Sequence, residues 1–254
     1  MIAIQRQKMI AELIRSEPDI TNTELEKRLF VSSATIRRDL IELEKAGQIH
    51  RIHGGAIPVN GLSYEIPFSY REKNNKIAKQ NIAAKAAEFV SNGDTVILDA
   101  SSTVANIVPF LSAKSDLTVI TNSPKTALSL ADSHIRTLVT GGLLLENSIA
   151  FVGRSAEAFL EGFSADVLFI SCRGVSEDGY LTDSSLEEAD IRRTMLHCLS
   201  RKGKKIALCD KSKLDRTYTH RICHMDELDS FITEKGIRLC KENIQPMTIC
   251  EKSP

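Results

Sequence analysis

The stretch Val31–Leu40, VSSATIRRDL, decides how the N-terminal part of the chain folds. Ile36 and Leu40 lie four residues apart, which places both on one face of a helix. Arg37 and Arg38 point away from that face and cannot share its core. The stretch therefore predicts a helix that packs through its aliphatic residues and presents two fixed positive charges outward.

Two more helical segments precede this helix. The first has an apolar stripe made of Met9, Ile10, Leu13 and Ile14. The second, TNTELEKRLF, begins at a capping residue, Thr21 or Asn22, and places a glutamate early against the helix dipole. Between this helix and the third there is room only for a short turn. That spacing is typical of a helix-turn-helix motif.

The third helix, SATIRRDLIELEKAG, has Ser32 as its expected N-cap and Gly47 as its expected left-handed end. The next segment, QIHRIHGGA, predicts a short hairpin with a Gly-Gly turn. Three short helices followed by a hairpin predict a winged helix-turn-helix over residues 1–57.

The outer face of the third helix is a candidate DNA-reading surface, because this is the end that a recognition helix inserts into the major groove. Arginine can bind guanine through two hydrogen bonds, and hydroxyls can bind phosphate. The alternative is a solvated face neutralised by Glu42 and Glu44. The residues expected to contact DNA are Ser32, Ser33, Thr35, Arg37, Arg38 and, on the wing, Arg51 and His53.

This segment resembles the N-terminal signature of the DeoR (deoxyribose-operon repressor) family of bacterial transcription regulators, a V-S-x-x-T-I-R-R-D-L core followed by H-G-G-A. Every fixed position is present, from Val31 to Leu40 and from His53 to Ala56. Phe30, beside the turn, is one departure. The resemblance implies a DNA-binding regulator.

Residues 58–75 hold Pro58, Gly61 and Pro67 and predict a linker with room for one short element. From Lys76 onward, apolar runs of four to six residues alternate with helical stretches, and one of these is SLEEADIRRTMLHCLSRKG. That alternation predicts a mostly parallel sheet with helices on both faces over residues 76–254. The segment after Glu234 is ambiguous, with Met247–Cys250 a candidate edge strand.

Polar loops follow the strands of this expected sheet. In open α/β sheets, ligands bind outside the carboxyl ends of the strands, where free helix N–H groups and hydroxyls can hold an anion. The alternative is that these side chains simply cap helices and turns. Lys211 and Lys213 would add positive charge. This chemistry suits a phosphorylated sugar.

The resemblance to the DeoR family continues through ILDASST, VITNS, VTGG and LCDKSK. It implies a non-catalytic sensor domain with the fold of ribose-5-phosphate isomerase, glucosamine-6-phosphate deaminase and CoA transferases. Family members often have Gly where this chain has Ser101. The effector contacts that the resemblance implies are Asp99, Ser101, Ser102, Thr103, Thr121, Asn122, Gly141, Gly142, Arg173, Asp183, Glu187 and Lys211.

The composition limits which classes of protein and of binding site the chain can represent. The chain has 33 basic and 33 acidic residues, so DNA affinity must come from arrangement rather than net charge. A membrane span and a signal peptide are both absent from the pattern, which predicts a cytoplasmic protein. The six cysteines form no CxxC pair and are expected to be buried and reduced. A zinc site at Cys223, His224 and His220 is a minor alternative.

These patterns favour a repressor of a sugar-catabolic operon that a phosphorylated sugar releases from its operator. Such a regulator needs at least a homodimer, because one small head contacts few base edges. We expect a dimer or tetramer, double-stranded operator DNA as partner, no membrane, no cofactor and no catalysis. Two alternatives remain: a sugar-phosphate isomerase or deaminase that uses Asp99, Asp183 or Glu187 as base, and a regulator that senses a non-phosphorylated ligand.

Overall fold

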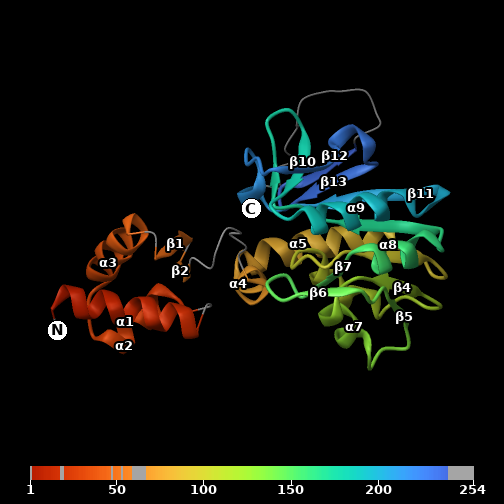
Figure 1. The fold of residues 1–254 in the computed structure, drawn as a ribbon. Helices are drawn as coiled ribbons and strands as arrows, with labels where there is room; N and C mark the ends of the chain where they lie inside the picture. Colours follow the sequence, from red (N-terminus) through yellow and green to blue (C-terminus); the bar gives the residue numbers. More distant parts are fainter. Residues whose placement is uncertain (1, 18–19, 47, 53, 59–66, 240–254) are drawn as a thin grey trace, which may run out of the picture. The chain divides into compact units, whose positions relative to one another are not determined.

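The computed structural model describes residues 2–17, 20–46, 48–52, 54–58 and 67–239 (Figure 1). The chain divides into two compact units, Met1–Arg71 and Glu72–Pro254. The division lies inside the stretch predicted as a linker. Within the described residues, no helix is both long and apolar enough to cross a membrane. The predicted DNA contact His53, the expected helix end Gly47 and the candidate strand Met247–Cys250 lie outside the described residues.

The first unit is a three-helix core with a β-hairpin. Ile10, Leu25, Ile36 and Leu40 are among the side chains that form its buried core. The predicted winged helix-turn-helix is therefore confirmed. Its elements are α1 (Ala3–Ser16), α2 (Asn22–Leu29), α3 (Ser33–Lys45), β1 (Ile49–Ile52) and β2 (Gly55–Pro58), the last two paired antiparallel.

Local hydrogen bonds fix where the second and third helices begin. Thr21 caps α2 in a reciprocal capping box with Glu24, and Ser32 caps α3 through the Thr35 amide. Both caps agree with the sequence. The prediction that Met9 belongs to the apolar stripe of α1 was wrong, because Met9 is 44% exposed. The buried face of α1 is formed by Ile10, Ala11 and Ile14.

The hairpin is attached to the start of α2 by backbone hydrogen bonds. The Asn22 amide donates to the Gly54 carbonyl at 2.9 Å, and Thr21 forms an isolated antiparallel bridge with Gly55. Gly55 fits closely here, because a Cβ at this position would lie 3.0 Å from the Ile20 carbonyl oxygen and would require that backbone to shift by a few tenths of an ångström. The wing is therefore tied to the helix-turn-helix rather than to the third helix alone.

The second unit is built on a seven-stranded sheet with the order β14-β13-β11-β8-β3-β4-β5 (Figure 1). All neighbours are parallel except the edge pair β13 and β14. This confirms the predicted mostly parallel sheet. Its strands are β3 (Thr95–Leu98), β4 (Thr118–Thr121), β5 (Arg136–Val139), β8 (Ala165–Ile170), β11 (Leu199–Leu208), β13 (Ser230–Thr233) and β14 (Gly236–Leu239).

Helices cover both faces of this sheet, as the alternating pattern predicts. Alternate strand residues such as Val96 and Ile97 belong to two different hydrophobic clusters, one on each face. One cluster includes α5, α6 and α7, and the other includes α8 and α9. These helices span Lys76–Ala86, Val108–Leu111, Pro124–Leu130, Arg154–Glu161 and Leu186–His197, and the short α4, Phe68–Lys73, precedes them.

Small antiparallel strands that the sequence did not indicate lie beside the main sheet. β6 (Leu143–Leu145) pairs with β7 (Ala150–Val152). A three-stranded sheet has the order β12-β10-β9, in which β12 is His220–His224, β10 is Tyr180–Asp183 and β9 is Gly174–Val175. Because β9 and β10 follow β8 directly, this sheet brings Asp183 back toward the strand ends.

The helical stretch predicted to run to Gly203 was too long. Helix α9 ends at His197, and Leu199 already pairs with Ala165 as the first residue of β11. The register shifts between Leu199 and Lys204, and a Cβ at Gly203 would lie 2.8 Å from the Ala165 carbonyl oxygen. Strand pairing with β8 therefore overrides the helical pattern, and glycine makes the bulge possible.

Candidate nucleic-acid interface and effector site

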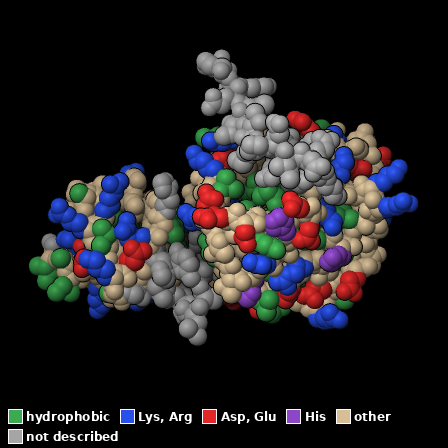
Figure 2. All heavy atoms as spheres, turned by 90° about the horizontal axis from the view of Figure 1, so that it is seen from above, with side chains coloured by type: hydrophobic (Ala, Val, Ile, Leu, Met, Phe, Trp, Pro, Cys, Tyr) green, Lys and Arg blue, Asp and Glu red, His purple; other side chains and the backbone are tan. Residues whose placement is uncertain are grey.

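The outer face of α3 presents two arginines to solvent. Arg37 and Arg38 are both exposed, and within the described residues neither has an acidic partner. Ser32 and Ser33 are exposed on the same end of the helix, and Thr35 is half-buried with its hydroxyl 3.0 Å from the Ser32 hydroxyl. Figure 2 shows Lys and Arg side chains spread over the visible face of this unit.

The acids that might have neutralised this face are engaged elsewhere. Glu42 accepts a hydrogen bond from Lys45 at 2.9 Å. Glu44 accepts one from the Arg51 amide at 2.9 Å and lies 3.6 Å from its guanidinium. Arg51 is thus oriented by α3 while it remains exposed. The arrangement leaves Arg37 and Arg38 as the uncompensated charges of the helix.

Asp39, the acid of the IRRDL sequence, holds α3 against α1. Its buried carboxylate accepts hydrogen bonds from Arg6 at 2.5 and 3.2 Å and from Gln7 at 3.2 Å. The hydrogen bond to Asp39 raises the pKa of the Arg6 guanidinium. Because this acid faces α1, it fixes the orientation of the two neighbouring arginines without pairing with them.

In the second unit, Asp99 organises the loop after β3. One carboxylate oxygen accepts from the Ser101 amide at 3.0 Å, and the other accepts from the Ser171 amide at 3.0 Å. The loop residues Ser101, Ser102 and Thr103 are buried, and the Ser101 hydroxyl accepts from the Val104 amide. Residues 101–103 follow β3, and Ser171 follows its neighbour β8. Their hydroxyls therefore lie near the carboxyl ends of two adjacent parallel strands, where ligands bind in open α/β sheets.

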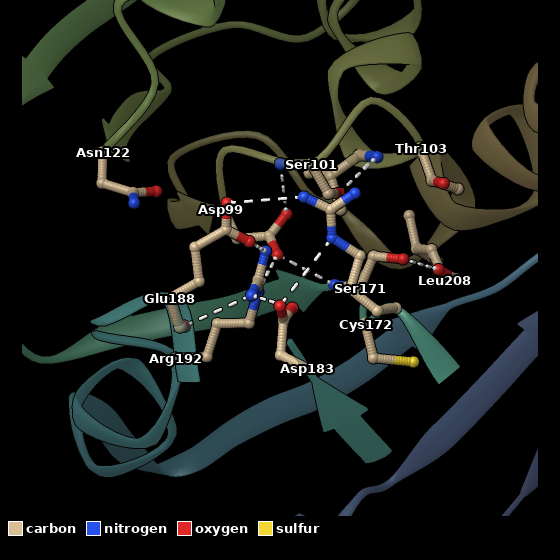
Figure 3. Close-up of polar contacts among 12 residues, drawn as sticks. Asp99, Ser101, Thr103, Asn122, Ser171, Cys172, Asp183, Glu188, Arg192 and Leu208 are labelled. Carbon is tan, nitrogen blue, oxygen red and sulfur yellow. Dashed lines mark hydrogen bonds and ion pairs between the residues drawn. The ribbon is translucent and has the colours of Figure 1, made fainter. Parts of the chain in front are cut away.

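Arg192 joins three buried carboxylates. Its guanidinium donates to Asp99 at 2.7 Å, to Asp183 at 2.8 Å and to Glu188 at 3.1 Å (Figure 3). Burial opposes the charged form, but the carboxylates of Asp99, Glu188 and Asp183 outweigh it and raise the pKa of Arg192. Three buried carboxylates therefore share the guanidinium of Arg192.

Arg173 lies beside the same acids but is incompletely paired. Its Nε is 3.8 Å from Asp183 and its Nη2 is 3.9 Å from Glu188, both beyond hydrogen-bond distance. The side chain is 9% exposed, and within the described residues these two nitrogens have no acceptor. Two buried N–H groups of Arg173 therefore have no hydrogen-bond acceptor among the described residues, although each lies within ion-pair distance of a carboxylate.

Two lysines contact hydroxyls of the loop after β3. Lys79, on α5, is buried and donates to Ser102 at 3.0 Å. Lys213 donates to Ser171 at 2.8 Å and to Thr103 at 3.3 Å. Burial would raise the pKa of Asp210, but Lys213 and hydrogen bonds from Ser212 lower it.

Asn75 connects this cluster to the segment before α5. Its side-chain amide donates to Asp210 at 3.0 Å and to the Ser212 hydroxyl at 3.1 Å. Its φ of 54° lies in the left-handed region, which asparagine tolerates better than most residues. The turn between α4 and α5 is thereby attached to the loop that carries Lys213.

Of the predicted effector contacts, Asp99, Ser101, Ser102, Thr103, Arg173 and Asp183 are brought into this network. Lys211 and Glu187 are exposed: the Lys211 amide donates to Glu234, and the Glu187 carboxylate accepts from Ser185. The structure thus directs Lys213, rather than Lys211, at the loop hydroxyls.

Among the described residues, none of the hydrogen bonds of this network involves Thr121, Asn122, Gly141 or Gly142, which lie beside the neighbouring strands. Asn122 donates to the Phe151 carbonyl at 2.9 Å, and no dashed line joins it to the cluster in Figure 3. Its Oδ1 is buried without a donor from the described residues. Gly142 has a φ of 110°, and a Cβ there would lie 2.6 Å from the Val152 carbonyl oxygen.

The predicted contacts did not include Lys79, Ser171, Glu188 and Arg192, which the structure brings into this network. Glu188 and Arg192 carry a local signal, because acid and base four apart share a helix face. Lys79, on α5, has no such local signal, because its partner Ser102 lies 23 residues away in the loop after β3.

The described residues contain no group of three His, Cys, Asp or Glu side chains that could hold a metal ion. The zinc alternative at Cys223, His224 and His220 therefore finds no support. His224 instead caps a short 3-10 helix and lies 2.9 Å from the Asp178 carbonyl oxygen.

Comparison with known families gives two matches that together cover most of the chain. Residues 6–60 match the DeoR-like helix-turn-helix domain, and residues 74–235 match the DeoR C-terminal sensor domain. Both matches fall on the regions in which the two candidate sites lie.

Similar proteins are transcriptional regulators. The chain is 38% identical to the uncharacterized HTH-type transcriptional regulator YulB of Bacillus subtilis, over 93% of this chain and 91% of that protein. It is 32% identical to the L-fucose operon activator of Escherichia coli K12, over 91% and 94%. It is 31% identical to the lactose phosphotransferase system repressor of Staphylococcus epidermidis, over 93% and 94%.

Among solved structures, the chain is similar to ribose 5-phosphate isomerase A of Methanocaldococcus jannaschii. The match has 17% identity and a TM-score of 0.41, and covers 56% of this chain and 55% of that one. At that score the likeness carries no inference about chemistry.

Proposed function

This chain belongs to the DeoR family of DNA-binding transcriptional regulators, and from that premise we propose that it represses a sugar-catabolic operon until a phosphorylated sugar binds its second unit. The DNA half rests on the exposed, unpaired Arg37 and Arg38 on the first turns of α3. With Ser32, Ser33, Thr35 and Arg51 around them, they form a surface of donors suited to bases and phosphates.

The proposal for the effector rests on one observation: two buried N–H groups of Arg173 have no acceptor within hydrogen-bond distance among the described residues, although Asp183 and Glu188 lie 3.8 and 3.9 Å away. A phosphate oxygen would satisfy them through charge-assisted hydrogen bonds. Lys79 and Lys213 add ammonium donors to the hydroxyls of the 101–103 loop. The remaining side of the site, lined by Asp99 and Asp183, suits sugar hydroxyls.

The same geometry favours binding over catalysis. A general base needs a carboxylate free to take a proton. Asp99 and Asp183 are both ion-paired with Arg192, and Glu187 is exposed. We therefore propose a non-catalytic site. Incubation with ribose 5-phosphate and with glucosamine 6-phosphate should give no turnover, and a clear rate with either would overturn this part.

The decisive experiment combines a thermal-shift screen of sugar phosphates with DNA binding. A ligand at about 100 times its Kd should stabilise the protein by about 2.7 kcal/mol. The same ligand should then weaken binding to operator DNA, because effector and DNA affect each other reciprocally. The matched control is the unphosphorylated sugar, which should do neither. A chain that binds no duplex DNA without ligand contradicts the proposal, and equal binding of the unphosphorylated sugar contradicts its phosphate specificity.

We further propose that Asn75 transmits ligand binding to the DNA-binding unit. It joins the turn after α4 to Asp210 and Ser212, next to Lys213. The test is Asn75→Gly, which tolerates the left-handed backbone and removes only the amide contact. This variant should bind sugar phosphate with near-normal affinity but release DNA poorly. Release as in the unmodified chain would exclude this role.

The regulator acts on the chromosome, so we place it in the cytoplasm, as a homo-oligomer whose paired heads contact two operator half-sites. Light scattering of the purified chain, with and without operator DNA, tests the assembly. A monomer bound to a single half-site at operator-level affinity would contradict it.

A further inference from the structure

Cys172 and Cys209 form a pair of thiols that the proposed regulation does not use. They follow β8 and β11, parallel neighbours whose register pairs Ile170 with Ala207. Cys172 and Cys209 each lie two residues beyond this pair. Their sulfur atoms lie 3.3 Å apart, and the side chains are 4% and 0% exposed. The two sulfurs are therefore buried and in direct contact just beyond the ends of two neighbouring strands.

The positions are compatible with a covalent bond. Neighbouring strands place opposed Cα atoms about 4.8 Å apart, within the range of about 4.4–6.8 Å that a disulfide accepts. The sulfurs would have to approach by about 1.3 Å to reach a bond of about 2.05 Å. That movement is small, but it must come from the two strand ends that carry the effector site.

The surroundings favour unequal reactivity of the two thiols. A hydrogen bond from Cys172, the charge of Lys213 and a contact with Ser171 lower the pKa of Cys209 despite its burial. The shared hydrogen bond and burial raise the pKa of Cys172. Since the thiolate is the nucleophile, we assign the first reaction to Cys209, whose sulfur lies 3.9 Å from the Ser171 hydroxyl that Lys213 contacts, and the resolving step to Cys172.

We propose that Cys172 and Cys209 are a peroxide-sensitive dithiol whose oxidation to a disulfide weakens anion binding at Lys213. The Cys209 thiolate attacks hydrogen peroxide, the O–O bond breaks, and the departing hydroxide takes a proton to become water. The Cys172 thiol then attacks the sulfenic sulfur, the S–O bond breaks, and a second water leaves with the thiol proton. Two thiols are oxidised and one peroxide is reduced to two waters.

The link to ligand binding follows from the residues beside each cysteine. Ser171 precedes Cys172, and its hydroxyl donates to the Leu208 carbonyl at 2.6 Å (Figure 3). The same hydroxyl accepts a hydrogen bond from Lys213 at 2.8 Å. Asp210 follows Cys209 and is bonded to Asn75 and Ser212. Drawing the sulfurs together shifts both neighbours and misaligns Lys213. This consequence rests on the proposed effector site, whereas the bond formation does not.

The first test uses the full chain treated with hydrogen peroxide, blocked with an alkylating reagent and mapped by mass spectrometry. The expected product is a peptide pair linked through Cys172 and Cys209 that dithiothreitol separates. Cys198→Ser and Cys223→Ser are matched controls and should keep the link, whereas Cys209→Ser should abolish it. Absence of the link in the folded chain, or its formation only after denaturation in urea, overturns the proposal.

The second test measures inorganic phosphate binding by calorimetry before and after oxidation. The Kd should rise about tenfold on oxidation, as expected for the loss of one charge-assisted hydrogen bond. Peroxide-treated Cys209→Ser should keep the Kd of the reduced protein. A linked protein with unchanged phosphate affinity overturns the regulatory half and leaves the proposed effector site intact. A reduced protein that binds neither phosphate nor any sugar phosphate refutes the effector site and this half together.

Discussion

The tripeptide Ile-Arg-Arg occurs in both units, at residues 36–38 in α3 and at residues 191–193 in α9. The two copies differ in the exposure and the ion pairing of their first arginine. Both isoleucines are buried. Arg37 and Arg38 are exposed, with no acidic partner among the described residues. Arg192, in contrast, is 4% exposed and bonded to three carboxylates. One local sequence serves an outward-facing surface in one unit and a buried ionic centre in the other.

The difference lies in what surrounds each helix. α3 buries only one face, which is formed by Ile36, Asp39, Leu40 and Leu43. Arg37 and Arg38 lie on the opposite face of the helix and are exposed to solvent. α9 packs against the main sheet and against β10 and β12 of the small sheet, and it buries residues on more than one side. Glu188, one turn before Arg192, supplies a local acid. The elements packed around a helix therefore decide whether an arginine is buried. The carboxylates on those elements decide whether its buried charge is compensated.

Removing the buried arginine should have the largest effect. Arg192→Met leaves Asp99, Asp183 and Glu188 buried without their cation, which should cost about 3–5 kcal/mol of unfolding free energy. Urea denaturation of the full chain measures it. The matched control, Arg193→Met, breaks a more exposed ion pair with Asp190 and should cost under about 1 kcal/mol. Equal losses in the two variants would show that the layered environment of Arg192 is not what distinguishes it.

Removing a site lysine should affect ligand affinity next. Lys213→Met takes a charged donor from Ser171 and Thr103 and should weaken sugar-phosphate binding by about 1.5–3 kcal/mol. Lys211→Met, two residues away and exposed, is the control and should change affinity little. Calorimetric titration decides between them. A larger effect of Lys211→Met would indicate that Lys211, as predicted from the sequence, contacts the ligand instead of Lys213.

The exposed arginines should show the smallest effect per residue and the clearest separation of roles. Arg37→Ala or Arg38→Ala should cost about 1–3 kcal/mol of operator binding, with stability and sugar binding unchanged. Arg28→Ala serves as control, because Arg28 is exposed on α2 but paired with Glu17 at 2.6 and 2.8 Å. Fluorescence anisotropy at several salt concentrations gives the affinities. Full operator affinity in both variants would mean that another face of the unit reads DNA.

The N-terminal unit could be predicted almost completely because its determinants are local. The caps at Thr21 and Ser32 and the spacing of Ile36 and Leu40 act within one or two helical turns. Only details such as the exposure of Met9 depend on how the helices pack.

The sensor unit was predictable in its alternating pattern and in the loop at Asp99. Its ionic centre was not, because Arg192 and Asp99 are 93 residues apart and the pairing depends on sheet order. The same reason explains the misplaced end of α9: Leu199 looks helical until β8 offers it a partner. Long-range pairing, rather than weak local preference, limited the prediction.

The backbone ties from Asn22 to Gly54 and from Thr21 to Gly55 have a consequence for how the N-terminal unit meets a duplex. They join the hairpin to the helix that precedes the turn, so the backbone segments that carry Arg51, Arg37 and Arg38 keep one arrangement before DNA is contacted. Little conformational entropy is then lost when DNA arrives. The proposed release of DNA would therefore move this unit as one body, because its helices and hairpin are already joined by these hydrogen bonds.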